Sequence, residues 1–338
     1  VYFSLIGSIF FIIAPVFLYR SGIHLSLMGQ WLILLAFYIE ILSTKYKSIL
    51  RGLNIVFSCT IHFYFTIILI LFNFIIQLFR FFEKRELLIK IIKETLITYI
   101  SLIIIMYILG YFSIRPEDGL GGGYGYYNLN LNSFFNPKSF TYFESFNWSF
   151  FLPENKSQNG EYEGFSYLGL GGFCFLYFLI INLVNSQYES IFSNKKIITI
   201  FFIFFILALS HNVNFGDQNL ILIKLNNYIY ALLSSIRASG RLVWPIYYII
   251  LFSGILIIFQ KFKNNQTSKI ILISILFIHF VDIAPGLKNY YLGTQYTNKD
   301  DIRNQYNDIF WEKLSKKINI IRAVEAKNYS NLYKYTTK

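Results

Sequence analysis

Long apolar runs separated by short basic loops constrain this chain more than any other feature. A run of roughly 17–25 apolar residues matches the thickness of a bilayer, whereas soluble domains carry about 25% charged residues and this chain carries 14%. We therefore predict an all-α integral membrane protein, a polytopic bundle of about eight or nine membrane helices. The apolar runs are Tyr2–Tyr19, Leu27–Leu42, Leu53–Phe79, Thr95–Tyr111, Phe165–Val184, Ile197–Leu209, Leu242–Phe259 and Ile270–Ile283.

The basic residues between the runs predict the orientation of the bundle. Lysine and arginine gather in cytoplasmic loops of membrane proteins, so the net charge of +12 indicates orientation and gives no reason to expect a nucleic-acid partner. The run Leu53–Phe79 agrees with this rule only if it leaves and returns, with a break near Cys59–His62; a single long tilted helix is the alternative. Residues 80–95 alternate charged and apolar side chains, and we expect them to form a helix along the cytoplasmic surface.

These segments divide the chain into four parts. Residues 1–112 are expected to form N-terminal membrane helices, and residues 113–165 a large external cap, here called the cap loop. Residues 166–283 add further membrane helices and a second external loop at 211–240, here called the second loop. Residues 284–338 are predicted to begin a small external domain. The cap loop is long but rich in aromatic residues, which disordered segments lack, so we predict that it is ordered.

Two arginines four residues apart are the sharpest candidate for chemistry. Arg237 and Arg241 precede an apolar run, and at the start of a helix both would project from one face. A guanidinium group matches a phosphate, and a helix N-terminus adds to the attraction. We expect these arginines to bind the phosphate of a donor; lipid head groups at the membrane surface are the other interpretation.

Two further groups of polar residues are predicted on the same side of the membrane. Arg20 and His24 are candidates for a pocket wall. Glu161 and Glu163 flank Tyr162, and in an extended turn both carboxylates would point one way; we expect the three to contact substrate, or alternatively to hold the loop by hydrogen bonds. The histidines and cysteines show no metal-ligand spacing, so we predict no metal and no cofactor.

The order of these motifs resembles the GT-C superfamily of polytopic membrane glycosyltransferases, in an uncharacterised bacterial branch. The resemblance spans most of the chain, and the residues that carry it are Pro15, Arg20 and His24 with Gly29-Gln30-Trp31, the turn Gly160–Gly169, Arg237 and Arg241 with Trp244-Pro245, and Val281-Asp282 with Trp311.

The resemblance implies a polyprenyl-phosphate sugar donor, a glycan or lipid acceptor, and transfer on the outer face of the cytoplasmic membrane, where membrane lipid surrounds the protein. It also implies that the catalytic base is a carboxylate in the first external loop, which we expect to precede Val1. Two alternatives stay open. One is a lipid-linked oligosaccharide polymerase or ligase, and the other is a non-catalytic transporter or flippase, which would carry charged residues along its helices.

Overall fold

The computed structural model describes residues 2–21, 24–84, 88–113, 123–140, 145–186, 188, 192–262 and 265–296. The chain separates into two compact units, Val1–Tyr290 and Tyr291–Lys338, and all sites discussed below lie in the first. Residues 297–338, which include Trp311 and most of the predicted external domain at 284–338, fall outside the described residues.

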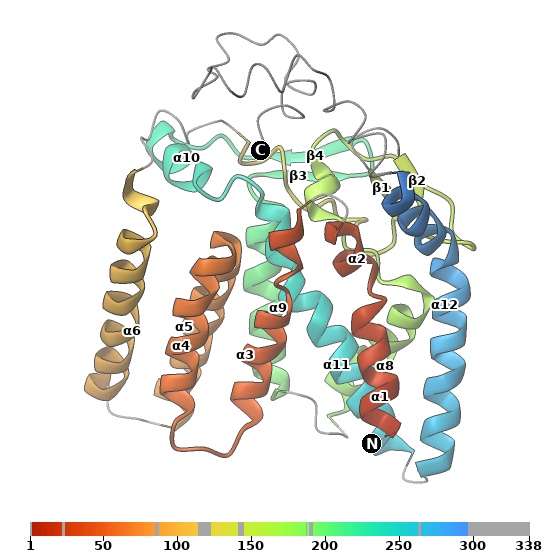
Figure 1. Cartoon of the computed structure of the whole chain (residues 1–338), viewed down its shortest axis with the longest axis horizontal. Helices are drawn as coiled ribbons and strands as arrows, with labels where there is room; N and C mark the ends of the chain where they lie inside the picture. The colour runs from red at the N-terminus through yellow and green to blue at the C-terminus, as the bar shows by residue number, and fades with distance from the viewer. Residues whose placement is uncertain are drawn as a thin grey trace, which may run out of the picture. The chain divides into compact units, whose positions relative to one another are not determined.

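Helices dominate the first unit and run side by side (Figure 1). The longer ones are α1 (Tyr2–Ile12), α3 (Trp31–Ile41), α4 (Lys47–Ile61), α5 (Phe63–Lys84), α6 (Leu88–Ile108), α8 (Gly169–Asn185), α9 (Asn194–Leu209), α11 (Trp244–Lys261) and α12 (Asn265–Tyr296). The shorter ones are α2 (Pro15–Ser21), η1 (Leu25–Met28), η2 (Tyr111–Ser113), η3 (Glu161–Gly164), α10 (Asn227–Ser234) and η4 (Ser239–Val243).

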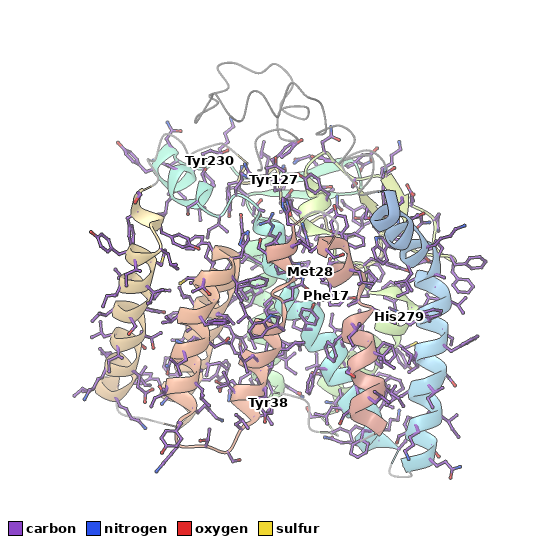
Figure 2. The ribbon with its side chains drawn as sticks, viewed as in Figure 1. Phe17, Met28, Tyr38, Tyr127, Tyr230 and His279 are labelled. Atoms are coloured by element: carbon purple, nitrogen blue, oxygen red, sulfur yellow. The ribbon has the colours of Figure 1, made fainter. Side chains whose placement is uncertain are left out.

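Two short antiparallel hairpins complete the described structure. In the cap loop, β1 (Lys138–Phe140) pairs with β2 (Ser145–Asn147), and in the second loop β3 (Asn212–Phe215) pairs with β4 (Gln218–Leu222). Figure 1 shows both hairpins and α10 at one end of the helices, and Figure 2 places Tyr127 and Tyr230 at that end, with Tyr38 at the other. The two long polar segments therefore lie on the same side of the bundle, as the sequence predicts.

Four described helices are long and apolar enough to cross a membrane: Phe63–Phe82, Leu88–Ile108, Ser239–Lys261 and Gln266–Asn289. Counting the bent pair Ser4–Ile12 and Pro15–Ser21 as one span raises this number to five, so the described helices include fewer full-length spans than the eight or nine predicted. The bend of 49° falls where Pro15 cannot donate a backbone hydrogen bond to the preceding turn.

The predicted break in the run Leu53–Phe79 is confirmed. The chain leaves helical geometry at His62, and α4 and α5 pack against each other as a helical hairpin. The predicted surface helix at 80–95 is wrong. Arg80 continues α5, and Glu94 lies within α6, where the two side chains form an ion pair with a 2.7 Å N–O distance. Pairing between neighbouring helices satisfies these charges without a separate amphipathic helix.

Burial divides the helices into central and peripheral ones. The candidate span Ser239–Lys261, which contains α11, is 78% buried, and many α11 side chains belong to the hydrophobic core. In α6 only 11% is buried, and its exposed residues include Ile97, Ile100 and Ile104. An apolar face this long is unfavourable in water. The described helices therefore indicate a membrane protein, in which α6 is a peripheral helix.

Candidate functional site

The candidate site lies where the cap loop meets the helices, between α2, η3 and η4. The two 3-10 helices touch through a pair of glycines. A Cβ atom on Gly240 would lie 2.7 Å from the Cα atom of Gly164, closer than atoms of real side chains approach. This close packing brings Glu163, in η3, beside Arg241, in η4.

Glu163 binds two arginines that are far apart in the sequence. Arg20, in α2, donates from one terminal nitrogen to Glu163 Oε2 at 2.6 Å and from the other to the Glu163 carbonyl oxygen at 2.7 Å. Arg241 donates from Nε to Oε2 at 2.9 Å and from a terminal nitrogen to Oε1 at 2.7 Å. We call Arg20, Glu163 and Arg241 the arginine–glutamate triad. Its forked contacts are the strong kind of charge-assisted hydrogen bond.

The triad is buried and keeps an excess of positive charge. Arg20 is fully buried, and Glu163 and Arg241 are 4% and 7% exposed. Burial raises the pKa of the Glu163 carboxyl, but the charges and hydrogen bonds of Arg20 and Arg241 outweigh it and lower this pKa to about 2. Glu163 is therefore ionised at neutral pH and balances only one of its two arginine partners.

More cationic and aromatic groups surround the triad. The Arg241 guanidinium carbon lies 4.4 Å from the centre of the Tyr64 ring, and that of Arg237 lies 5.0 Å from the centre of the Tyr127 ring. These separations permit cation–π attraction. Arg237 is exposed, whereas Arg241 is buried, so Arg237 is the more accessible of the two to a ligand.

His24 belongs to the same group. Burial is the main effect lowering the pKa of its imidazole, and the charges of Arg241, Arg20 and Arg237 lower it further, against the opposite effect of Glu163. The lowered pKa favours the neutral imidazole of His24, which can accept a hydrogen bond. His62 lies at the break before α5, and its pKa is lowered by burial first and by Arg241 second.

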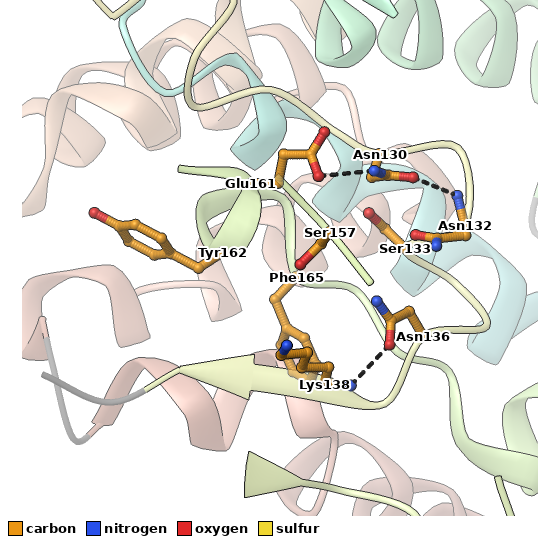
Figure 3. Close-up of a pocket in the computed structure, with 9 residues that line it drawn as sticks. All are labelled: Asn130, Asn132, Ser133, Asn136, Lys138, Ser157, Glu161, Tyr162 and Phe165. Atoms are coloured by element: carbon orange, nitrogen blue, oxygen red, sulfur yellow. Dashed lines mark hydrogen bonds between the residues drawn. The ribbon is translucent and has the colours of Figure 1, made fainter. Parts of the chain in front are cut away.

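Glu161 occupies a separate position in the cap loop (Figure 3). Its carboxylate accepts hydrogen bonds from Asn130 Nδ2 at 2.7 Å, Asn214 Nδ2 at 2.9 Å and the Gln158 backbone N–H at 2.8 Å. Burial raises the pKa of Glu161, and these three hydrogen bonds oppose the rise. The contacts tie the cap loop to the second loop, which favours the structural interpretation of Glu161 over direct substrate contact.

The structure corrects two expectations about geometry. The turn around Tyr162 is a 3-10 helix and is not extended, so Glu161 and Glu163 reach different partners, and Figure 3 shows Tyr162 pointing away from Glu161. Arg237 precedes η4 and Arg241 lies within it, ahead of α11, so they do not share a face at the N-terminus of an α-helix.

The predicted site residues nevertheless gather in one region. Arg20, Glu163 and Arg241 are in direct contact. Tyr127 joins Arg237 to Tyr162, because its ring lies 5.8 Å from the Tyr162 ring. The negative charge of Glu163 acts to raise the pKa of both His24 and Tyr162. Their roles in binding remain predictions, and Glu161 is set apart in its own hydrogen-bond network.

A second polar cluster clamps the cap loop to α12. The buried Asp282 carboxylate accepts hydrogen bonds from Ser149 Oγ, from Tyr167 Oη at 2.7 Å and from the Leu170 backbone N–H at 2.9 Å. The fully buried Trp148 packs against Gly286, where a Cβ atom would overlap the indole ring. Asp282 thus has a complete set of partners and serves as an anchor. Among the described residues, no group of three or more His, Cys, Asp or Glu side chains is placed to hold a metal ion.

The fold and site define a class: a helical membrane protein with a polar cap loop over a buried arginine–glutamate triad. The chain belongs to the family described as DUF6311, a domain of unknown function, which matches residues 1–284. This match includes every residue of the triad. Comparisons with curated proteins and with solved structures found no match.

Proposed function

We propose that this chain is a membrane glycosyltransferase that transfers a sugar from a polyprenyl-phosphate donor to a glycan or lipid acceptor at the cell surface. One observation carries the proposal. Excess positive charge, from the triad and Arg237, is held where apolar helices end and the polar cap loop begins. In a donor with a lipid tail and a phosphate, the negative charge likewise lies where the apolar part of the molecule ends.

The contacts suggest different roles for the three arginines in binding a phosphate. Arg20 and Arg241 are held by Glu163, so their orientation is set before a ligand arrives. Arg237 is exposed and rests on Tyr127, so it can turn toward a phosphate at little cost. A preset cationic site of this kind stabilises charge that grows in a transition state.

The proposed reaction is a displacement at the anomeric carbon. The acceptor hydroxyl oxygen forms a bond to this carbon while the bond to the phosphate oxygen breaks, and the electron pair leaves with the polyprenyl phosphate. The arginines stabilise the phosphate as it departs. The hydroxyl proton passes to a base to which we assign no residue, because Glu161 and Glu163 are both occupied by hydrogen bonds.

We further propose that the shorter apolar helices also lie in the membrane, for a total of about eight or nine membrane segments. The five candidate spans, with the bent pair counted as one, are joined by the shorter apolar helices Leu25–Ile41 and Gly169–Asn185. Adding α4 and α9 gives nine. Figure 1 shows that α4, α6 and α12 start at the end away from the strands, and these starts carry basic residues such as Lys47, Lys90 and Lys269. By the positive-inside rule, this end faces the cytoplasm, and the cap loop lies outside the cytoplasmic membrane.

The first test is lipid binding by the full-length protein in nanodiscs. Decaprenyl phosphate is the probe, decaprenol is the uncharged control, and native mass spectrometry measures the bound fraction. We expect decaprenyl phosphate to bind more tightly. Arg237→Ala should weaken this binding about tenfold, the loss expected for a charge-assisted hydrogen bond. Lys224→Ala, which removes another exposed cation from the second loop, should leave it unchanged.

The same assay separates the alternatives. Preference for decaprenyl diphosphate would favour a polymerase or ligase. Equal binding of decaprenyl phosphate and decaprenol, or identical behaviour of the two variants, would reject the phosphate site. If the monophosphate is preferred, sugar transfer from a decaprenyl-phosphate sugar distinguishes an enzyme from a transporter.

A further inference from the structure

A pocket of about 430 Å³ lies between the cap loop and the second loop, apart from the arginine–glutamate triad. Its volume is within the range of about 300–1,000 Å³ that is typical of small-molecule sites. The pocket is lined by Gly125, Tyr126, Ser157, Gln158, Asn159 and Asn212.

The lining combines an aromatic ring with uncharged polar groups. Tyr126 is 50% exposed. Asn159 and Gln158 supply amide donors and acceptors, and Ser157 supplies a hydroxyl group. None of the six lining residues is charged, so the pocket does not suit an ionic ligand. A neutral sugar fits this chemistry, because its ring has an apolar face for an aromatic side chain and hydroxyl groups for the amides.

Several contacts hold the pocket in shape. The Tyr126 ring packs edge-on against Tyr127, with 4.8 Å between ring centres. Gly160 lies directly behind it with φ of +96°, and a Cβ atom there would be 2.5 Å from the ring. The left-handed conformation and the tight contact both favour glycine. Two other lining residues are joined directly, because Asn212 Nδ2 donates to the Gly125 carbonyl oxygen at 2.8 Å.

Glu161 also supports the pocket. Its Oε2 atom accepts hydrogen bonds from the Gln158 backbone N–H and from Asn130 Nδ2, and its Oε1 atom accepts one from Asn214 Nδ2. The wall formed by Ser157, Gln158 and Asn159 is thereby tied to the body of the cap loop. A pocket already formed before binding loses less entropy when it takes up a ligand.

A pair of contacting aromatic rings connects the pocket with the proposed phosphate site. Tyr126 contacts Tyr127, and Arg237 rests on Tyr127. We propose that this pocket binds a neutral sugar unit of the acceptor glycan. The binding of a neutral sugar rests on the pocket alone, whereas its role as acceptor rests on the proposed glycosyltransferase function.

Saturation-transfer NMR on the full-length protein in nanodiscs tests the inference. The probes are maltotriose, cellotriose, mannotriose and N,N′,N″-triacetylchitotriose, with glucuronate as a charged comparison. We expect at least one neutral trisaccharide to receive saturation and glucuronate to receive none. Tyr126→Ala should weaken binding about tenfold and Tyr126→Phe by less than about threefold, because the ring supplies the contact.

Two further variants distinguish a specific loss of sugar binding from a general loss of folding. Asn159→Ala removes an exposed amide from the pocket and should also weaken binding. Phe215→Ala removes a 55% exposed aromatic ring from β3, outside the pocket lining, and should have no effect. The inference is overturned if no trisaccharide binds, or if Tyr126→Ala and Asn159→Ala both bind like Phe215→Ala.

The two proposals fail in different ways. Trisaccharide binding that depends on Tyr126, without binding of decaprenyl phosphate, keeps the sugar pocket and rejects the transferase. Decaprenyl phosphate binding that depends on Arg237, without trisaccharide binding, keeps the phosphate site and rejects the pocket.

Discussion

Glu163 is the residue on which the site depends most, because two buried guanidinium groups share its carboxylate. Replacing it by glutamine keeps the size and removes the charge. We expect Glu163→Gln to lower the free energy of unfolding by roughly 3–5 kcal/mol, since breaking a buried ion pair leaves uncompensated charge. Thermal unfolding in detergent measures the loss. Glu154→Gln, at an exposed position in the cap loop, is the control, and equal melting of both variants would contradict the prediction.

The same carboxylate predicts how stability depends on pH. The pKa of Glu163 is about 2 in the folded protein against a usual value of 4.5, so the unfolded chain binds its proton more readily. The stabilisation is complete above pH 4.5 and is lost as the pH falls toward 2. Unfolding measured between about pH 6 and pH 3 should show this loss. The loss should be smaller in Glu163→Gln; an identical pH dependence in the variant would assign the effect to other groups.

At the residue scale, the sequence predicted which residues belong to the site better than it predicted the contacts among them. Arg20, Arg237 and Arg241 attract attention because they flank apolar runs, where charged side chains are often functional. Glu163 attracts attention because it flanks Tyr162 in a turn of the cap loop. Their pairing depends on the approach of Gly164 and Gly240, which no local pattern reveals. Asn130 and Asn214 were not predicted at all, because a lone asparagine in a polar loop carries no signal of its own.

At the scale of elements, α8 packs closely against α11, and a glycine permits this approach. A Cβ atom on Gly254 would lie 2.7 Å from the Cα atom of Phe175 and would clash with its side chain. Gly254→Ala should therefore push α11 away from α8 and cost about 1–3 kcal/mol. Thermal unfolding in detergent again measures the change.

Gly7 in α1 provides the matched control for Gly254. It is also a buried helical glycine, but the nearest atom to a Cβ there would be Ile255 Cδ1 at 3.9 Å, an ordinary contact. Gly7→Ala should leave stability unchanged or raise it slightly, because alanine favours helix more than glycine does. A larger loss in Gly7→Ala than in Gly254→Ala would show that α8 and α11 are not packed as described.

The sequence predicted the reversal near His62 because basic loops lie on both sides of the run Leu53–Phe79, and the positive-inside rule places both loops on one side of the membrane. It failed at residues 80–95, where charged side chains at helical spacing resemble a surface helix. The ion pair between Arg80 and Glu94 forms between α5 and α6, and a pattern along one segment cannot show a partner on another.

At the scale of the whole molecule, the arrangement of segments predicts their sidedness. Figure 1 shows the hairpins of the cap loop and the second loop at one end of the helices, and the starts of α4, α6 and α12 at the other. Lys47, Lys90 and Lys269 belong to these helix starts. Three cysteine variants test this: Lys156→Cys in the cap loop, Tyr228→Cys in α10 and Lys45→Cys between α3 and α4, all at exposed positions. In intact cells, a membrane-impermeant maleimide should label Lys156→Cys and Tyr228→Cys, and should label Lys45→Cys only after permeabilisation.

The native thiols set the background for this test. Cys59 is buried and Cys174 is partly buried, so both are replaced by alanine before the new cysteines are introduced. Labelling of Lys156→Cys and Tyr228→Cys from opposite sides would contradict the fold itself. Labelling of both from the cytoplasm, with Lys45→Cys outside, would keep the fold and reverse its orientation. The triad would then face the cytoplasm, where it could not serve sugar transfer at the outer face of the membrane.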